Sequence, residues 1–202
     1  MNLPHFPYGK TEMNYLIEKD PLLGEAIKKY GYVPRETMPD LFPALIYQII
    51  SQQVSIKGAL TVWSRLQNLL PEMTPENIDE METAKIQQCG TSMRKVSYMK
   101  SLSYHILEGR LDLDALFFLP EDMICQKLTQ VKGIGIWTAE MFMIFSMQKP
   151  DILSFNDLGI RRGLCRLYQH DSLTEDLFEK YKKRYSPYAT IASFYLWLIS
   201  EE

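Results

Sequence analysis

Two glycines, Gly133 and Gly135, interrupt the otherwise helical stretch LTQVKGIGIWTAEMFMIF. Glycine costs roughly 0.5–1 kcal/mol relative to alanine inside a helix, but it accepts positive φ and leaves backbone amides open to an outside group. These amides precede a helix predicted to begin near Ile136, and a helix N-terminus suits a phosphate, as does the charge of Lys132. A helix–turn–helix packed only for structure is the alternative, and spacing alone does not decide between the two.

A second candidate for chemistry is the carboxylate of Asp157, which precedes the helical pattern LGIRRGLCRLY. The dipole of a helix favours the ionised form of an acid at its N-terminus. A fixed, ionised carboxylate can stabilise developing positive charge, and it can orient or deprotonate a water molecule. The alternative is a plain N-cap, which is the usual role of an Asn-Asp pair before a helix. Asp122, Asp151 and Asp171 are interpreted as caps or surface groups.

The bulk composition is that of an ordinary globular protein, with 46% hydrophobic, 23% charged and 12% aromatic residues among 202. No secretory signal or membrane-spanning run is visible, so we expect a cytoplasmic protein with no membrane contact. Three scattered cysteines argue against a disulfide framework, a Cys-x-x-Cys zinc site and a four-cysteine iron–sulfur cluster. The net charge of −3 gives no global footprint for nucleic-acid binding, so such a role would need a local basic patch.

The elements that must position these groups are helices throughout. We predict an all-α fold of roughly nine or ten helices, with no strand longer than a few residues. Predicted helix starts carry a capping or first-turn residue, and these are Asp40, Ser55, Thr74, Ser92, Pro120, Asn156 or Asp157, and Thr174. Gly90 and Gly109 are predicted helix ends. The last helix, within PYATIASFYLWLIS, is apolar on most sides and is expected to be buried.

Four segments together resemble the helix-hairpin-helix (HhH-GPD) superfamily of DNA glycosylases, which includes endonuclease III and 3-methyladenine DNA glycosylase II. LTQVKGIGIWTA resembles the family's hairpin, and the others, in the family's order, are IISQQVSIKGALTVWSRL, CGTSMRKVSYMKSL and QKPDILSFNDLGIRRG. They span about residues 40 to 170. One hairpin is a weak signal, whereas four ordered matches are a strong one.

The resemblance implies two helical subdomains that flank a DNA-binding cleft, in a monomer. One would comprise residues 1–39 with 150–202 and carry the catalytic aspartate. The other would comprise residues 40–149, with the helix-hairpin-helix at about 120–148. The 3-methyladenine glycosylase II of the family also has an N-terminal β-rich subdomain. Only about forty residues precede the first match here, so we expect that subdomain to be absent or vestigial.

Trp137 separates two branches of the family. Bifunctional members carry a nucleophilic lysine at this position, form a Schiff base and cleave the strand. A Schiff base needs an amine, which an indole lacks. The resemblance therefore implies a monofunctional enzyme that hydrolyses the glycosidic bond, with no required cofactor and no iron–sulfur cluster.

The resemblance assigns Asp157 as the catalytic residue, at the family's spacing of twenty residues after Trp137. Breaking a glycosidic bond builds positive charge on the sugar, which a carboxylate stabilises. The everted base would stack in a pocket formed by Trp137, Met141, Leu158 and Tyr185. Tyr185 stands where the family usually has tryptophan, so the base preference of this wall is left open.

DNA contacts are also implied by the resemblance. Gln53, in the Q-Q-V-S segment, is the expected wedge that fills the duplex where the base leaves. The expected phosphate contacts are Lys132, the amides of Gly133 and Gly135, and the side chains of Arg94, Lys95 and Arg161. The hairpin's carbonyls suit a monovalent cation that faces the same phosphate. The family places such a Na⁺ or K⁺ ion on the carbonyls of Thr129, Val131 and Ile134.

The resulting hypothesis is a monofunctional DNA glycosylase that flips out and removes alkylated bases, chiefly 3-methyladenine-like purines. It would act on double-stranded DNA in base excision repair, as a bacterial-type cytoplasmic protein associated with the nucleoid. One alternative is a glycosylase for another damaged or mismatched base. The other is a catalytically silent DNA-binding module that uses the hairpin only to hold phosphates, although an acidic protein is poorly suited to that role.

Overall fold

The computed structural model describes residues 4–202 and confirms the all-α prediction. Twelve α-helices and one 3₁₀ helix are assigned, and ten of the α-helices are seven residues or longer. No strand is assigned among the described residues, although His5 and Glu36 form an isolated antiparallel bridge. No helix in this part of the chain is both long enough and apolar enough to cross a membrane.

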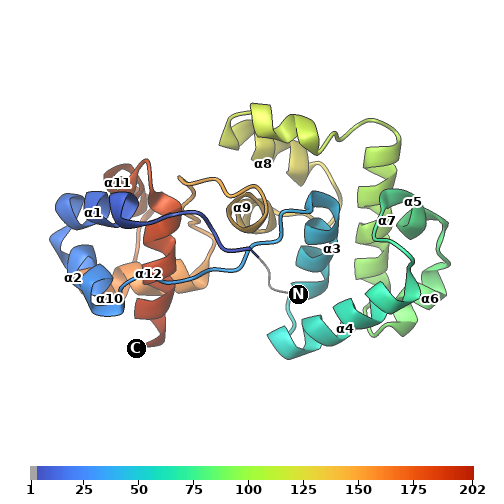
Figure 1. Ribbon diagram of the computed structural model, residues 1–202, viewed down its shortest axis with the longest axis horizontal. Helices are drawn as coiled ribbons and strands as arrows, with labels where there is room; N and C mark the ends of the chain where they lie inside the picture. Colours follow the sequence, from blue (N-terminus) through green and yellow to red (C-terminus); the bar gives the residue numbers. More distant parts are fainter. Residues whose placement is uncertain (1–3) are drawn as a thin grey trace. The chain divides into compact units, whose positions relative to one another are not determined.

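The chain divides into two compact units (Figure 1). The first unit comprises the residues up to Thr37 together with Met143–Glu202, and the second comprises Met38–Phe142. The second boundary lies within helix α9 (Ile136–Phe145), whereas the sequence had placed it at residue 150. Each unit holds one part of the predicted site, Asp157 in the first and the hairpin in the second.

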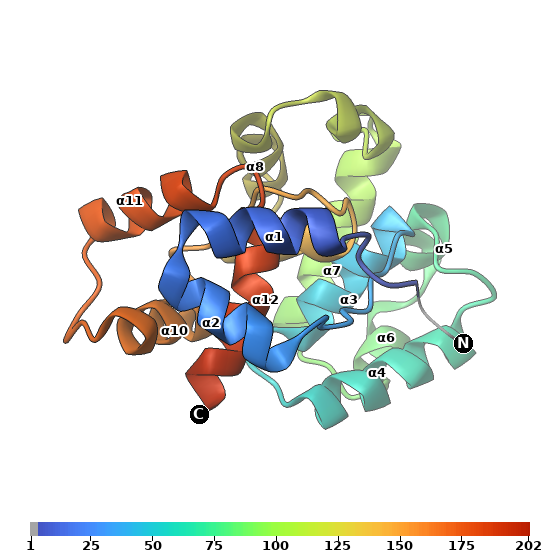
Figure 2. The ribbon, with the colours of Figure 1, turned by 60° about the vertical axis from the view of Figure 1, so that its left-hand side comes forward.

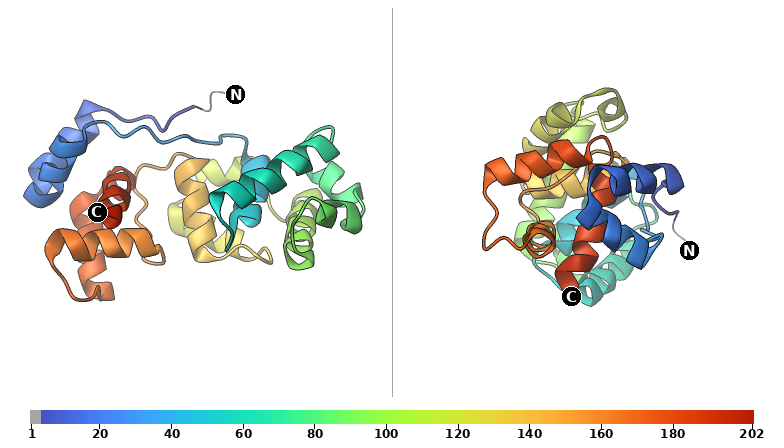
Figure 3. Two further views of the ribbon diagram at one scale, coloured as in Figure 1. Left: turned by 90° about the horizontal axis from the view of Figure 1, so that it is seen from below. Right: turned by 90° about the vertical axis from the view of Figure 1, so that its left-hand side faces the viewer.

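The first unit is built around its last helix. It contains α1 (Lys10–Lys19), α2 (Pro21–Tyr30), α10 (Leu158–Tyr168), α11 (Glu175–Tyr185) and α12 (Ala189–Glu201). Helix α12 packs against the other four, most extensively against α10, and Figures 2 and 3 show these two helices side by side. All residues of α12 from Ala189 to Leu196 are buried, and so is Ile199, as the apolar sequence of this helix predicts.

The second unit carries the hairpin. It contains α3 (Leu41–Ser51), α4 (Ile56–Leu69), α5 (Pro75–Glu80), α6 (Thr83–Gln88), α7 (Met93–Leu107), the 3₁₀ helix η1 (Asp114–Phe118), α8 (Glu121–Thr129) and the first seven residues of α9. Helix α7 packs on α3, α5 and α6 and forms the centre of this unit. Its buried apolar residues are Val96, Met99 and Leu102.

Most of the predicted helix starts are confirmed by their capping hydrogen bonds. Ser55, Thr74, Ser92 and Thr174 each accept a hydrogen bond from the backbone N–H three residues further along, at 3.2–3.3 Å. Such a bond satisfies one of the amides that a helix N-terminus leaves without a partner. Asp40 occupies the N-cap position of α3 without a capping bond from its side chain.

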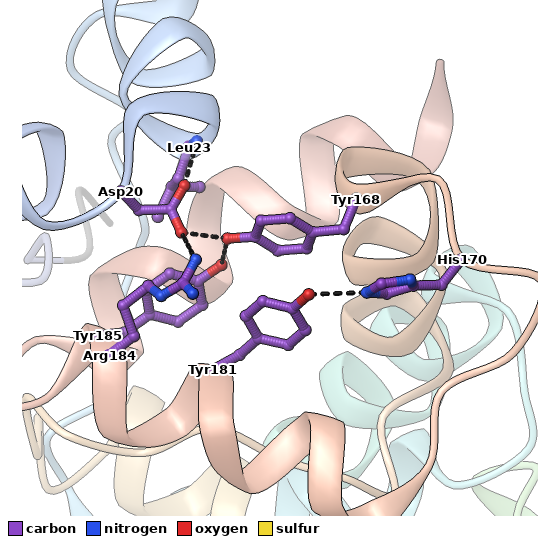
Figure 4. A network of polar contacts seen from close by, with 7 residues as sticks. All are labelled: Asp20, Leu23, Tyr168, His170, Tyr181, Arg184 and Tyr185. Carbon is purple, nitrogen blue, oxygen red and sulfur yellow. Dashed lines mark hydrogen bonds and ion pairs between the residues drawn. The ribbon is translucent and has the colours of Figure 1, made fainter.

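A buried polar network joins α2, α10 and α11 within the first unit (Figure 4). The carboxylate of Asp20 caps α2 through the backbone N–H of Leu23, accepts from the Tyr168 hydroxyl and pairs with Arg184 at 2.6 Å. The Tyr168 hydroxyl also lies 2.7 Å from that of Tyr185. These contacts join the ends of three helices, because Asp20 is the N-cap of α2, Tyr168 is the last residue of α10, and Arg184 and Tyr185 are the last two residues of α11.

Candidate functional site

Asp157 is the N-cap of α10. The sequence had predicted that either Asn156 or Asp157 would occupy this position. Its Oδ1 accepts the backbone N–H of Ile160 at 2.9 Å, which is the ordinary capping bond. The same oxygen accepts the indole Nε1–H of Trp197, also at 2.9 Å. The side chain is well buried, with 8% of the residue exposed. The carboxylate is therefore held by two N–H donors from two different helices of the first unit.

Trp197 was not predicted as a site residue. The sequence shows it only as one of many apolar residues in the buried helix α12, and its contact with Asp157 spans forty positions of the chain. The usable signal is the residue type, because the N–H of a tryptophan that packs against the protein interior usually finds an acceptor, and Trp197 is partly buried.

Two predicted residues lie beside Asp157 on α10. Leu158 follows it directly and is 57% exposed, so its apolar side chain has surface to offer to a ligand. Arg161 is exposed, and its guanidinium lies 5.0 Å from the centroid of the Phe155 ring. The first turn of α10, which follows Asp157 directly, thus exposes one apolar side chain and one cation at the surface.

Tyr185 does not fit its predicted place in the wall of the base pocket. The residue is completely buried, and its hydroxyl is bonded to that of Tyr168. Burial also raises the pKa of Tyr185 well above the usual value for a tyrosine. Its role is that of a core residue at the end of α11, which corrects the sequence prediction.

The surroundings of the two hairpin glycines differ, and so does the reason for a glycine at each position. Gly133 has φ +93°, and a Cβ at this position would lie 2.1 Å from Cγ of Tyr98, so the close approach of that ring requires glycine. Gly135 has no atom within 4 Å of its ideal Cβ position and is exposed. The sequence interpretation gave two reasons for these glycines, a positive φ and an open backbone. The positive φ is found at Gly133, the open surroundings are found at Gly135, and the packing of Tyr98 on Gly133 was not predicted.

Some of the site residues predicted from the sequence are exposed at the surface around the hairpin. Lys132 is exposed, and Trp137 in the first turn of α9 is 37% exposed. Ile136 beside it is 53% exposed. Met141, one turn further on, is 4% exposed, so it offers almost no surface to a ligand and does not fit a pocket-lining role.

The predicted cation ligands lie in the connection between α8 and α9. Thr129 is the last residue of α8, and the carbonyl of Val131 accepts the N–H of Ile134 at 3.1 Å. A carbonyl oxygen has two lone pairs, so this bond leaves Val131 able to bind an ion. Three neutral oxygens suit a hard cation such as Na⁺ or K⁺. The donor set fits the predicted ion, which remains a prediction.

Lys95 does not fit its predicted contact with a DNA phosphate. It is 8% exposed, and its ammonium donates to the carbonyls of Ile50 and Gln52 at 2.7 and 2.6 Å. Burial, and secondarily the charge of Arg94, lowers its pKa below the usual value for lysine. Its role is to satisfy carbonyls at the C-terminal end of α3, where helices leave such groups without partners.

The Lys95 bonds hold the loop that carries the predicted wedge. Gln53 lies in this loop between α3 and α4, is exposed, and has φ +55°, a left-handed conformation that is uncommon for a residue other than glycine. Gln52 next to it donates its side-chain amide to the carbonyl of Gly133 at 2.8 Å. The loop and the hairpin are therefore joined within one unit, and Gln53 projects from a loop with fixed ends.

A cavity of about 360 Å³ lies against the same loop. Its lining includes Gln53, Val54, Ser92 at the start of α7, and Arg94, which is exposed. Arg94 and Lys132 thus supply exposed cations in a unit whose loop and hairpin are tied together. A protein of net charge −3 would need such exposed cations near a ligand to contact phosphates, and this role of Arg94 and Lys132 remains a prediction.

Comparison with known proteins identifies a family and several relatives. The model of the HhH-GPD superfamily base excision DNA repair proteins matches residues 46–187. DNA-3-methyladenine glycosylase 1 of Schizosaccharomyces pombe is 31% identical over 178 residues, which cover 85% of this chain and 78% of the relative. The DNA-3-methyladenine glycosylase of Saccharomyces cerevisiae is 29% identical over 92% of this chain and 78% of its own.

Solved structures agree with these relatives. A DNA-3-methyladenine glycosidase from Bacillus halodurans superposes with a TM-score of 0.87 at 34% identity, over 98% of this chain and 93% of its own. The S. pombe 3-methyladenine DNA glycosylase, determined in complex with abasic DNA, has a TM-score of 0.84 at 29% identity. That match covers 96% of this chain and 98% of the neighbour.

Proposed function

Because the chain belongs to the HhH-GPD superfamily of base excision DNA repair proteins, we propose that it is a monofunctional glycosylase for alkylated DNA bases. Its substrate is double-stranded DNA that contains a 3-methyladenine-like purine, and its reaction is hydrolysis of the N-glycosidic bond. Relatives that cover most of the chain carry the name DNA-3-methyladenine glycosylase, which supports this substrate class. The product is a free base and an abasic site.

The observation that carries the mechanism is the carboxylate of Asp157. An alkylated purine bears positive charge and leaves readily, so the difficult part of the reaction is the cationic sugar that remains. A buried carboxylate held by two N–H donors is pre-organised to stabilise that charge and to orient or deprotonate the attacking water. No general acid is required for such a leaving group.

The indole of Trp137 supports the monofunctional assignment. A lyase reaction through a Schiff base needs an amine at this position, and an indole has none. An electron-poor, cationic purine stacks favourably on an indole. Trp137 is partly exposed at the start of α9, where it can receive an everted base.

The hairpin and the neighbouring loop hold the DNA in this proposal. The exposed amide of Gly135 and the ammonium of Lys132 bind a phosphate, assisted by a monovalent cation on the carbonyls of Thr129, Val131 and Ile134. Gln53 fills the space that the everted base leaves in the duplex. Lys95 acts indirectly, by fixing the loop from which Gln53 projects.

The test is base release from methylated duplex DNA, with strand breakage scored separately. The wild-type protein should release 3-methyladenine without nicking the strand, and Asp157→Asn should lose this activity. Asp171→Asn, which removes the same charge from an exposed position, should retain it.

Release accompanied by strand cleavage would contradict the monofunctional assignment. Absence of any methylated base among the products, with duplex binding intact, would contradict the alkylated substrate. In that case a panel of oxidised and mismatched duplexes distinguishes another base specificity from a silent DNA-binding module.

A further inference from the structure

We propose that Trp197 is a positioning residue for catalysis, whose indole N–H sets the orientation of the Asp157 carboxylate; this inference rests on the proposed function. The backbone N–H of Ile160 donates to Oδ1 of this carboxylate from within α10 itself, at 2.9 Å. The indole of Trp197 reaches the same oxygen from another helix, at 2.9 Å. Two donors on one oxygen from different directions fix both the position and the plane of the carboxylate.

The indole is itself held in place by packing in the first unit. It stacks on the ring of Phe145, with centroids 5.8 Å apart and planes at 19°, and on that of Phe194 at 6.1 Å and 25°. The guanidinium of Arg35 lies 5.8 Å from the indole centroid and donates to the carbonyl of Phe194 at 3.1 Å. A ring packed by three neighbours keeps one orientation, so its N–H is a fixed donor.

The cation of Arg35 also acts on the strength of this donor. A guanidinium near the face of an indole draws electron density from the ring, which makes the N–H a better donor to a carboxylate. Hydrogen bonds to a charged acceptor are about twice as strong as those between neutral groups. Arg35, Trp197 and Asp157 thus form a line of contacts that ends at the candidate catalytic group.

Gly159 makes room for this contact. A Cβ at this position would lie 2.7 Å from Cδ1 of Trp197 and 3.2 Å from Oδ1 of Asp157. Its φ lies outside the left-handed region, so an alanine would be accommodated by the backbone but not by the indole. Glycine in the first turn of α10 is therefore explained by the approach of Trp197 to Asp157.

The first experiment compares Trp197→Phe with the wild type in single-turnover base release. Phenylalanine keeps an aromatic ring and removes the N–H. The maximal rate should fall about 10-fold, the equivalent of roughly 1.4 kcal/mol for one hydrogen bond to a charged group. The protein concentration that gives the half-maximal rate should change less than 2-fold, on the order of 0.4 kcal/mol.

Tyr195→Phe is the matched control. Tyr195 lies on the same helix, is completely buried, and donates its hydroxyl to the carbonyl of Gly31 at 3.0 Å. The substitution removes the hydrogen bonds of a hydroxyl on α12 that does not contact Asp157. It should lower stability to a similar extent and leave the rate unchanged.

The decisive measurement is the rate of base release by the double variant that combines Trp197→Phe with Asp157→Asn. If Trp197 acts through the carboxylate, Trp197→Phe should not lower the residual rate of Asp157→Asn any further, because groups that act as a unit are non-additive. Gly159→Ala should behave in the same way, lowering the rate of the wild type and not that of Asp157→Asn. An equal loss in both backgrounds would show a general structural role and overturn the proposal.

The outcomes separate this inference from the proposed function. A wild-type protein that releases base, with a Trp197→Phe variant of equal rate, overturns the positioning role and leaves the function intact. A wild-type protein that releases no base overturns the function and with it the catalytic role of Trp197.

Discussion

Two buried aspartates of the same unit, Asp20 and Asp157, begin their helices in the same way. Asp20 caps α2 through the N–H of Leu23 at 3.0 Å, and Asp157 caps α10 through that of Ile160 at 2.9 Å. Both are well buried, at 1% and 8% exposure. Judged by the local sequence, both are ordinary N-caps.

They differ in the donors that reach them from other helices. Asp20 receives the Tyr168 hydroxyl and the guanidinium of Arg184, which carries a full positive charge. Asp157 receives the neutral indole N–H of Trp197. The charge of Asp20 therefore matters to the fold, because its loss would leave a partly buried guanidinium without its partner. The two N–H donors of Asp157 do not require its charge, because an uncharged amide oxygen could accept from them as well.

The largest expected difference between the two is in rate. Asp157→Asn should lower the rate of base release by about 10²–10³, the usual cost of removing an electrostatic stabiliser of the transition state. Asp20→Asn should leave the rate per folded molecule within about 3-fold of the wild type, well under 1 kcal/mol. Both are measured in single turnover, with the folded fraction determined by circular dichroism. A similar loss in both variants would show that Asp157 acts only as a cap.

For stability we expect the opposite order, with the larger effect from Asp20→Asn and the smaller one from Asp157→Asn. Asp20→Asn should cost about 2 kcal/mol of unfolding free energy, less than a fully buried pair because the Arg184 side chain is 33% exposed. Asp157→Asn should cost less than about 1 kcal/mol, since the amide oxygen replaces the carboxylate oxygen as acceptor. Urea unfolding measures both. A larger cost for Asp157→Asn would contradict the distinction between the two aspartates.

A smaller effect is expected from the aromatic donors. Tyr168→Phe removes the hydroxyl from Asp20 and should cost about 1 kcal/mol of stability, which lowers Tm by about 2–4 °C in a protein of this size. Its ring can still stack on Tyr181, whose centroid is 4.1 Å away. Base release should not change, in contrast to the effect of Trp197→Phe. A reduced rate in Tyr168→Phe would mean that the Asp20 network also supports the active site.

Local features of this molecule could be predicted from the sequence, and contacts between distant helices could not. The caps at Ser55, Ser92 and Thr174 need only a few consecutive residues, and their bonds form as expected. The same reasoning applied to Asp20 and Pro21 would have predicted the start of α2, which the sequence interpretation passed over. Asp157 was selected through its spacing from the hairpin, a feature of the family.

The features that the sequence did not reveal share one cause, which is long-range packing. Lys95 looks like a surface cation in the sequence, but its ammonium is used by carbonyls more than forty positions away. Tyr185 looks like a pocket wall and is a core residue, and Gly133 is explained by the ring of Tyr98. Spacing along one helix contains no information on which other helix will cover a side chain, so these three roles required the structure.

The smallest expected effect is on the pH dependence of stability, and it concerns Asp20. Burial raises the pKa of this carboxyl, but the bonds from Leu23, Tyr168 and Arg184 outweigh it, so the pKa lies below the usual value of 3.8. A carboxyl with a lowered pKa stabilises the folded state above its ordinary pKa, and this contribution is lost as the pH falls through the lowered value. Between about pH 5 and pH 2 the wild type should therefore lose stability more steeply than Asp20→Asn.

Asp171→Asn, which removes an exposed carboxyl, should follow the wild-type curve in urea unfolding at each pH. Parallel curves for the wild type and Asp20→Asn would show that the pairing with Arg184 does not favour the charged carboxylate, and the contrast with Asp157 would then rest on rate alone.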